Sequence, residues 1–334
     1  MRYNRLVTRD ALLDRLREGT AGAWHWYQWH FRAHARQPVP FVDALVDALL
    51  AADAVMPGYA ARMADTIVAF RGRESDYSDY EQLLQVLAEI HVAAHVAQAA
   101  WPDGTSFADE PVAPGSARNP ELVVFTERYR LGIEVKAPRL LDHEKMRNSR
   151  PMQAGGRIFE PDHLTKVAGG KDKVTLPRDN PVKDYLVSAD GKFASFHVDD
   201  ADFRGLLVIV WDDYVYEPVT ALLHPGSGLL TDRSFARDRN GPLRYPNVDA
   251  VVVLSHLQHL RMALGEGHPD LPFRMSDVAF SWSLDLARPA ALIVPPEGRG
   301  LPDGIADSLQ LVPIEELTGA EYRAPDLIHW IRIP

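Results

Sequence analysis

Residues 132–138, with the sequence GIEVKAP, place two charged side chains in an otherwise apolar stretch. In an extended strand alternate side chains share a face, so Glu134 and Lys136 point one way while their neighbours point into the core. Thirteen residues before Glu134, Glu121 opens a second apolar run. The polar segment 126–130 between them is short enough to turn one strand back beside the other. The sequence therefore predicts that Glu121, Glu134 and Lys136 meet at one place.

Two carboxylates and an ammonium group suit metal-assisted hydrolysis of a phosphodiester. Mg²⁺ prefers oxygen ligands, keeps several waters and is anchored by only one or two carboxylates. Such an ion polarises a phosphoryl oxygen and helps to generate hydroxide. A lysine beside it orients the nucleophile or neutralises developing charge. These residues therefore indicate a phosphodiesterase site that uses Mg²⁺, with Mn²⁺ as a substitute.

The pattern resembles the PD-(D/E)xK nucleases, also called restriction-endonuclease-like nucleases. Glu134-Val135-Lys136 matches the ExK half of the motif, and Pro120-Glu121 stands where the family has Pro-Asp, with a side chain one methylene longer. The resemblance covers about residues 80–212. It implies an α/β fold, a restriction-endonuclease-like mixed sheet flanked by helices. It also implies a metal-dependent endonuclease that hydrolyses phosphodiester bonds of nucleic acid, DNA in the first instance, in a microbial restriction or defence system.

The expected elements follow the α-β-β-β-α-β order of that family. We predict a helix at 81–100, strands at 105–112, 121–125 and 130–136, a helix at 182–189 that Gly191 ends, and a strand at 205–211. In the family, a glutamate on the helix before the first core strand often completes the metal site. The resemblance assigns this role to Glu89. The alternative is an acid at the edge of an apolar stripe that reaches solvent.

Three regions are expected along the chain. Residues 1–75 form a helical N-terminal region, 76–215 the nuclease-like core, and 216–334 an α+β C-terminal extension. Within the two flanks, we predict helices at 7–17, 24–36, 41–52, 59–70 and 256–264, and strands at 249–254, 280–286 and 290–294.

A local excess of positive charge follows the candidate catalytic strand. The whole chain carries a net charge of −10, yet residues 136–183 hold eleven basic and six acidic residues. A basic stretch can follow the phosphates of a nucleic acid, although a solvated polar loop is the alternative. The candidate nucleic-acid-binding residues are Arg139, Lys145, Arg147, Arg150, Lys171, Lys173 and Lys183. The connection between the predicted strand at 130–136 and the predicted helix at 182–189 is long for a compact domain, which suggests a functional or mobile insertion.

Composition limits the setting and the partners. The chain has no cysteine, so disulfides and thiolate zinc sites are excluded, and the composition fits a reducing cytoplasm. No apolar run approaches the ~18 residues that span a membrane, and the N-terminus lacks the apolar core of a signal peptide. We therefore expect a cytoplasmic protein with nucleic acid as its partner and no membrane partner. A homo-oligomer and an operon-encoded protein partner both stay open.

Other residue patterns point to weaker alternatives. The pairs His30/His34 and His91/His95 have the i, i+4 spacing that can bring two imidazoles to one metal, but chance pairs are expected among 13 histidines. The aromatic segment 24–31 can stack on bases or pack on a neighbouring helix. The main rival to a nuclease is a non-catalytic binding or scaffolding protein that has kept the nuclease fold.

Overall fold

The computed structural model describes residues 7–71, 77–112, 118–157, 160–263, 278–282, 289–323 and 329–331. Four helices come first, close to the predicted positions: α1 (Arg9–Gly19), α2 (Gln28–His34), α3 (Pro40–Val55) and α4 (Tyr59–Ala69). In α3, Val42, Leu45 and Leu49 repeat at helical spacing and are all fully buried. The N-terminal helices therefore form because each has an apolar stripe to bury, and the four helices predicted here are present.

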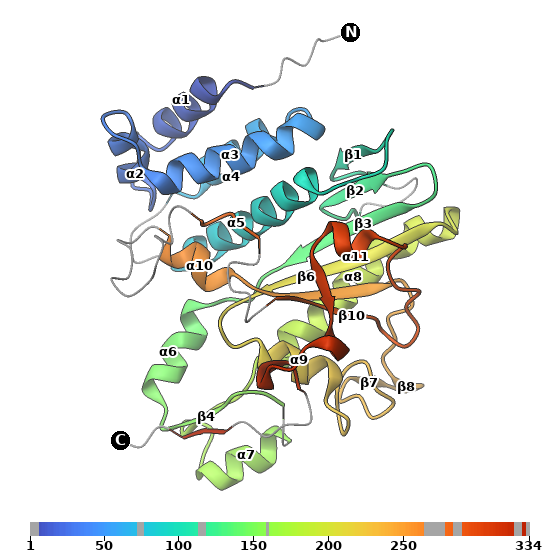
Figure 1. The fold of residues 1–334 in the computed structure, drawn as a ribbon. Coiled ribbons are helices and arrows are strands. Elements are labelled where there is room, and N and C mark those ends of the chain that lie inside the picture. Colours follow the sequence, from blue (N-terminus) through green and yellow to red (C-terminus); the bar gives the residue numbers. More distant parts are fainter. Residues whose placement is uncertain are drawn as a thin grey trace.

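A seven-stranded mixed sheet forms the centre of the molecule (Figure 1). Its strands, in spatial order, are β1 (Ser106–Asp109), β2 (Leu122–Phe125), β3 (Arg130–Lys136), β6 (Phe203–Trp211), β9 (Ala250–Ser255), β10 (Ala290–Ile293) and β11 (Leu311–Pro313). The pairs β1–β2, β2–β3 and β9–β10 are antiparallel, while β3–β6, β6–β9 and β10–β11 are parallel. The predicted class, a mixed α/β sheet flanked by helices, is confirmed.

Helices cover both faces of this sheet. On one face lie the N-terminal helices and α5 (Tyr77–Gln98), which share an apolar core with β2 and β3 residues such as Leu122 and Ile133 (Figure 1). On the other face lie α8 (Asp179–Asp199) and α9 (Tyr216–Leu223), in a second core with Val123 and Phe203. Strands β6 and β9 are buried on both sides, which explains why their sequences read as continuous apolar runs.

The C-terminal region joins the same sheet. Residues of β9 pair in register with β6, beginning with Leu206 opposite Ala250, and β10 and β11 extend the sheet further. The boundary expected at residue 215 therefore falls within one sheet, because β6 lies between strands from both sides of it. The expected strand at 280–286 lies largely outside the described residues, and β12 (His329–Ile331) pairs with the insertion described below.

Helix α8 is longer than the sequence suggests. It begins at Asp179 and continues through Gly191 to Asp199, so the prediction that Gly191 ends the helix is wrong. A Cβ on Gly191 would lie 2.5 Å from Nη1 of Arg118. The contact is with the flexible tip of an exposed arginine, so Gly191 lies beside Arg118 within the helix and does not end it.

The long connection between β3 and α8 is an insertion with helices and strands of its own. It contains α6 (Leu141–Ser149), β4 (Met152–Ala154), α7 (Pro161–Ala168) and β5 (Val174–Thr175).

The remaining elements are β7 (Arg237–Asp238), β8 (Gly241–Pro242), α10 (Leu257–Met262), α11 (Ile305–Ser308), η2 (Ile314–Glu316) and η3 (Ala320–Tyr322). Across the described ranges, no helix is both long and apolar enough to cross a membrane.

Candidate active site

The β2–β3 hairpin brings the predicted residues together. Leu122 pairs with Ile133, and continuing this antiparallel register by one residue sets Glu121 opposite Glu134. The Glu134 carboxylate is fully buried. Nζ of Lys136, two residues along the same face, lies 2.5 Å from Oε1 of Glu134. The short polar turn thus produces the juxtaposition of Glu121, Glu134 and Lys136 that the sequence suggested.

A second lysine, which the sequence analysis missed, comes from α8. Nζ of Lys192 lies 2.7 Å from Oε1 of Glu134 and 3.4 Å from Oε1 of Glu121. Burial lowers the pKa of Lys192, but the carboxylates of Glu134 and Glu121 together outweigh this effect and leave the pKa above its ordinary value. Because glycine is typical of a helix end, the sequence predicts that Lys192 lies outside the helix. The available signal was the helical spacing of Lys192 from Ala189, which is buried.

The carboxylates of Glu121 and Glu89 hold protons more tightly than usual. Burial raises the pKa of Glu121, and the charge of Glu134 raises it further, against the opposing ammonium groups of Lys192 and Lys136. Burial likewise raises the pKa of Glu89 to about 8, with Glu121 adding to the rise. Several carboxylates thus compete for the positive charge of two lysines. Such a site favours an additional proton or cation.

Glu89 reaches this region from the opposite face of the sheet. It lies on α5, is half-buried, and lines a cavity together with Lys136. Its pKa responds to the charges of Glu121, Lys136 and Glu134, so the four side chains share one electrostatic environment. The structure therefore does not leave the Glu89 carboxylate in bulk solvent.

The cavity beside Glu89 and Lys136 has a volume of about 450 Å³. We name it the α5–α6–α8 cavity after the helices that contribute its walls. Residues from each part of the wall are Gln85 and Glu89 of α5, Lys136 at the end of β3, Met146 of α6, and Asp184 and Tyr185 of α8. Its size is typical of a small-molecule site.

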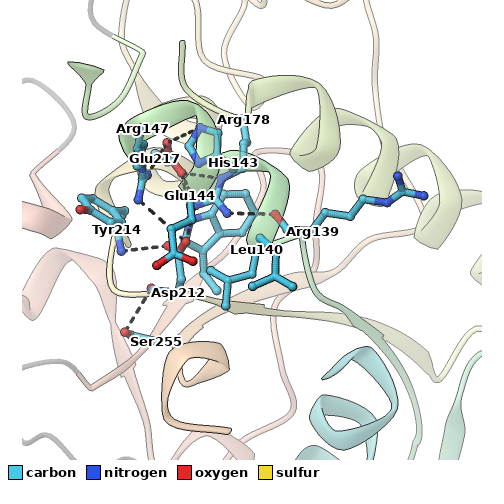
Figure 2. Close-up of polar contacts among 12 residues, drawn as sticks. Arg139, Leu140, His143, Glu144, Arg147, Arg178, Asp212, Tyr214, Glu217 and Ser255 are labelled. Atoms are coloured by element: carbon cyan, nitrogen blue, oxygen red, sulfur yellow. Dashed lines mark hydrogen bonds and ion pairs between the residues drawn. The ribbon is translucent and has the colours of Figure 1, made fainter. Parts of the chain in front are cut away.

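Helix α6 of the insertion forms part of the cavity wall, and buried ion pairs hold the insertion against the rest of the fold (Figure 2). Glu217 of α9 accepts hydrogen bonds from Arg147 of α6 at 2.9 Å and from Arg178, just before α8, at 2.5 Å. Arg178 also lies 2.8 Å from Asp212, at the end of β6. All four side chains are at most 9% exposed. Paired buried charges of this kind fix the relative positions of the elements that carry them.

The predicted nucleic-acid-binding residues do not form a single exposed set. Arg139, Lys145, Lys171 and Lys173 are exposed. Lys183 is half-buried and lies 3.2 Å from Asp184. Arg150 is also half-buried, and its guanidinium donates to the carbonyl of Val174.

Arg147 does not belong to an exposed basic surface. It is buried and its charge is balanced by Glu217, which is 70 residues away in the sequence. A count of local charge could not reveal this, because the balancing acid lies outside the insertion. The guanidinium stabilises the position of α6, and the predicted contact with nucleic acid has to be carried by the exposed residues.

The other patterns have separate locations. His34 lies 3.0 Å from Asp43, and His91 stacks on His256 with ring centroids 3.8 Å apart. Trp26 packs against Tyr80, whereas Trp29 is 67% exposed. His34 and His91 thus each contact a residue outside their own pair.

The donor set suits a hard cation in chemistry. Glu121 and Glu134 supply carboxylate oxygens in opposed register, and two carboxylates with water commonly anchor Mg²⁺. Lys192 shows where a positive charge is accommodated, because its ammonium contacts both. Within the described ranges no three or more His, Asp or Glu side chains are gathered so that they could hold a metal ion. The residues therefore fit an ion with two protein ligands, provided that Lys192 moves aside.

Comparison with models of protein families, with curated protein sequences and with solved structures gives no match.

Proposed function

We propose that the chain is a Mg²⁺-dependent nuclease with a restriction-endonuclease-like core formed by α5, β1, β2, β3, α8 and β6. One observation carries the proposal: Glu121 and Glu134 lie opposite each other at the end of a buried hairpin, and Nζ of Lys136 lies 2.5 Å from Oε1 of Glu134. The order of the six core elements, interrupted only by the insertion between β3 and α8, supports the same proposal. The substrate is nucleic acid, DNA in the first instance, and the setting a microbial restriction or defence system.

Each side chain has a distinct role in this proposal. Glu121 and Glu134 hold the ion, and Glu89, on α5, adds negative charge to the same electrostatic environment when it loses its proton. Bound Mg²⁺ would supply Lewis-acid polarisation of the phosphoryl oxygen and lower the pKa of the attacking water. Lys136 orients that water and stabilises the negative charge that develops on the phosphoryl oxygens. Lys192, released from Glu121, remains available to a second phosphoryl oxygen.

Cleavage of mixed nucleic acids tests the proposal. Single-stranded and duplex DNA and RNA are incubated with the purified chain in Mg²⁺, Mn²⁺ or EDTA. We expect cleavage with either metal and none in EDTA. Glu134→Gln should lose at least a hundredfold in rate, while Glu127→Gln, an exposed acid in the turn of the same hairpin, should match the wild type. Equal rates for the two variants would contradict the proposed role of Glu134.

Metal binding is tested without activity. A cation that binds only the folded state raises the melting temperature by mass action. We expect Mn²⁺ to stabilise the wild type and Glu127→Gln, and to have a much smaller effect on Glu134→Gln. An equal response in all three proteins would remove Glu134 from the metal site.

Lys136→Ala should separate chemistry from binding. Stabilisation of developing charge acts in the chemical step, so this variant should bind nucleic acid but cut it at least a hundredfold more slowly. Replacing the exposed Lys145, Lys171 and Lys173 with alanine should instead weaken binding and flatten its salt dependence. Wild-type cleavage by Lys136→Ala would end the nuclease assignment.

A non-catalytic binding or scaffolding protein is the second candidate function. The observation in its favour is Lys192, whose ammonium contacts both carboxylates and stands where the ion is proposed to bind. This reading predicts nucleic-acid binding that is indifferent to Mg²⁺ and no cleavage under any of the conditions above.

A further inference from the structure

The α5–α6–α8 cavity is closed on the side of α6 by a fixed helix. The backbone N–H groups of Leu140 and Leu141, where α6 begins, donate to the Glu81 carboxylate of α5 at 2.7 and 2.6 Å. Towards its other end, Arg147 is bound to Glu217 (Figure 2). Because α6 is held at both ends by buried or half-buried charge, the cavity is formed before any ligand arrives.

The charges on the cavity wall cancel. Arg178 is neutralised by Glu217 and Asp212. Glu89, whose pKa is raised to about 8, is mostly protonated and uncharged at neutral pH. The two remaining cationic side chains, Lys136 and Arg139, are matched by the carboxylates of Asp142 and Asp184. A wall of this kind does not favour a highly charged ligand such as a polyphosphate. It favours an uncharged body that has its own hydrogen-bonding groups.

The remaining wall suits a nucleobase. Val135, Met146 and Pro181 supply apolar surface, and the ring of Tyr185 supplies an aromatic one. Tyr185 is held in place by a 2.9 Å hydrogen bond from its hydroxyl to the carbonyl of Ala137. Aromatic side chains commonly stack on unpaired bases. The Gln85 amide adds a hydrogen-bonding group, since its one hydrogen bond within the described ranges is a long one of 3.4 Å to the same carbonyl.

We propose that this cavity binds one unpaired nucleotide next to the phosphodiester that is cut, so that the substrate is single-stranded or has a base drawn out of its helix. The inference rests on the proposed nuclease function. Lys136 links the two, because it contacts Glu134 and also lines the cavity. A cavity of about 450 Å³ beneath α6 admits a nucleoside but not a double helix. A base can therefore enter only after it leaves its stack.

Two tryptophan variants of α6 test the cavity. Met146→Trp fills it, whereas Ser149→Trp places the same bulk on an exposed position of the same helix. Melting is measured in EDTA with millimolar deoxyadenosine monophosphate, deoxyribose 5-phosphate or inorganic phosphate. We expect the nucleotide alone to raise the melting temperature of the wild type and of Ser149→Trp by several degrees, and to leave Met146→Trp unchanged.

A milder variant covers the case in which Met146→Trp does not fold. Gln85→Ala removes one hydrogen-bonding group and should weaken nucleotide binding about tenfold. Equal shifts with deoxyribose 5-phosphate and with the nucleotide would overturn the proposal, as would a wild-type response of both Met146→Trp and Gln85→Ala.

Oligonucleotides distinguish failure of the cavity from failure of the nuclease. In EDTA, a labelled single strand should bind at least tenfold more tightly than its duplex, and Met146→Trp should remove most of that difference. If duplex and single strand are bound and cleaved equally by the wild type and by Met146→Trp, the cavity proposal is wrong and the nuclease stands. If single strands bind through the cavity but no metal supports cleavage, the nuclease is wrong and the cavity stands.

Discussion

Nζ of Lys192 lies 2.7 Å from Oε1 of Glu134, although 58 residues separate the two in the chain. The contact joins α8 to β3 on the face of the sheet to which Glu134 and Lys136 point. It also gives a fully buried carboxylate a second positive partner besides Lys136. Without a metal ion, this pair of ammonium groups is what makes burial of Glu134 tolerable.

Lys192→Met should therefore destabilise the metal-free protein. Removing one partner of a buried pair costs about 3–5 kcal/mol, and since Lys136 remains and Lys192 is partly exposed we expect roughly 1–2 kcal/mol. Urea unfolding in EDTA measures the loss. Lys183→Met on the same helix, whose partner Asp184 is largely exposed, should cost less than about 0.5 kcal/mol. Equal losses in the two variants would show that the contact between Lys192 and Glu134 contributes nothing to stability.

Glu89→Gln should stabilise the metal-free protein at alkaline pH. The pKa of Glu89 is raised to about 8, so the folded state resists its ionisation while the unfolded state does not. The resulting cost is absent below pH 4.5, grows as the pH rises, and is complete above pH 8. Glutamine removes it, and we expect a gain of roughly 4–5 kcal/mol at pH 8.5 and almost none at pH 4.5. Unfolding in urea with EDTA at both pH values checks this; a gain that does not depend on pH would contradict it.

Local signals in the sequence were sufficient for the hairpin. Apolar β-branched residues with a short polar turn fix β2 and β3, and the alternation along β3 places Glu134 and Lys136 on one face. The predicted strand at 130–136 coincides with β3. The N-terminal helices were equally predictable, because each carries an apolar stripe that recurs at helical spacing.

Long-range relationships were not predictable. Glycine is typical of a helix end, yet α8 continues past Gly191 because its packing against the rest of the fold outweighs this local preference. Only because the helix continues does Lys192 reach Glu134. Local charge likewise made the insertion look like a basic loop. Its buried Arg147 is balanced by Glu217, whose position depends on the fold of a distant helix. A charge count measures composition within a segment and says nothing about partners outside it.

The buried ion pairs around Glu217 should behave as a unit. Arg178→Met leaves Glu217 and Asp212 with less positive charge and should cost about 3–5 kcal/mol. The double variant Arg178→Met/Glu217→Leu should cost less than the sum of the two single variants, because each removes the partner that the other leaves unpaired. Arg233→Met, at an exposed position, is the control and should change stability by less than about 0.5 kcal/mol. Strict additivity in urea unfolding would show that the two side chains are independent.

Stacked histidines between α5 and α10 should make the fold sensitive to acid. Rings of His91 and His256 stack 3.8 Å apart, with His259 next to His256 at 5.2 Å and His95 stacked on Trp282 at 3.9 Å. Burial lowers the pKa of His95 to about 4 and that of His256 to about 3. Burial also puts the pKa of His91 well below its ordinary value, and its three histidine neighbours lower it further.

The direction of the pH effect follows from these shifts. The unfolded chain takes up protons on His91, His95 and His256 below about pH 6.5, whereas these histidines stay neutral in the folded chain until much lower pH. The stability that these three histidines contribute is therefore complete above pH 6.5 and falls as the pH drops from there towards 4. Well below pH 6.5, protonation of each of these histidines in the unfolded chain lowers the free energy of unfolding by about 1 kcal/mol for each pH unit. His91→Leu should make the dependence of the unfolding free energy on pH between 5 and 6 shallower by about one proton. A wild-type slope in His91→Leu, measured by urea unfolding at several pH values, would exclude His91 as a source of the acid sensitivity.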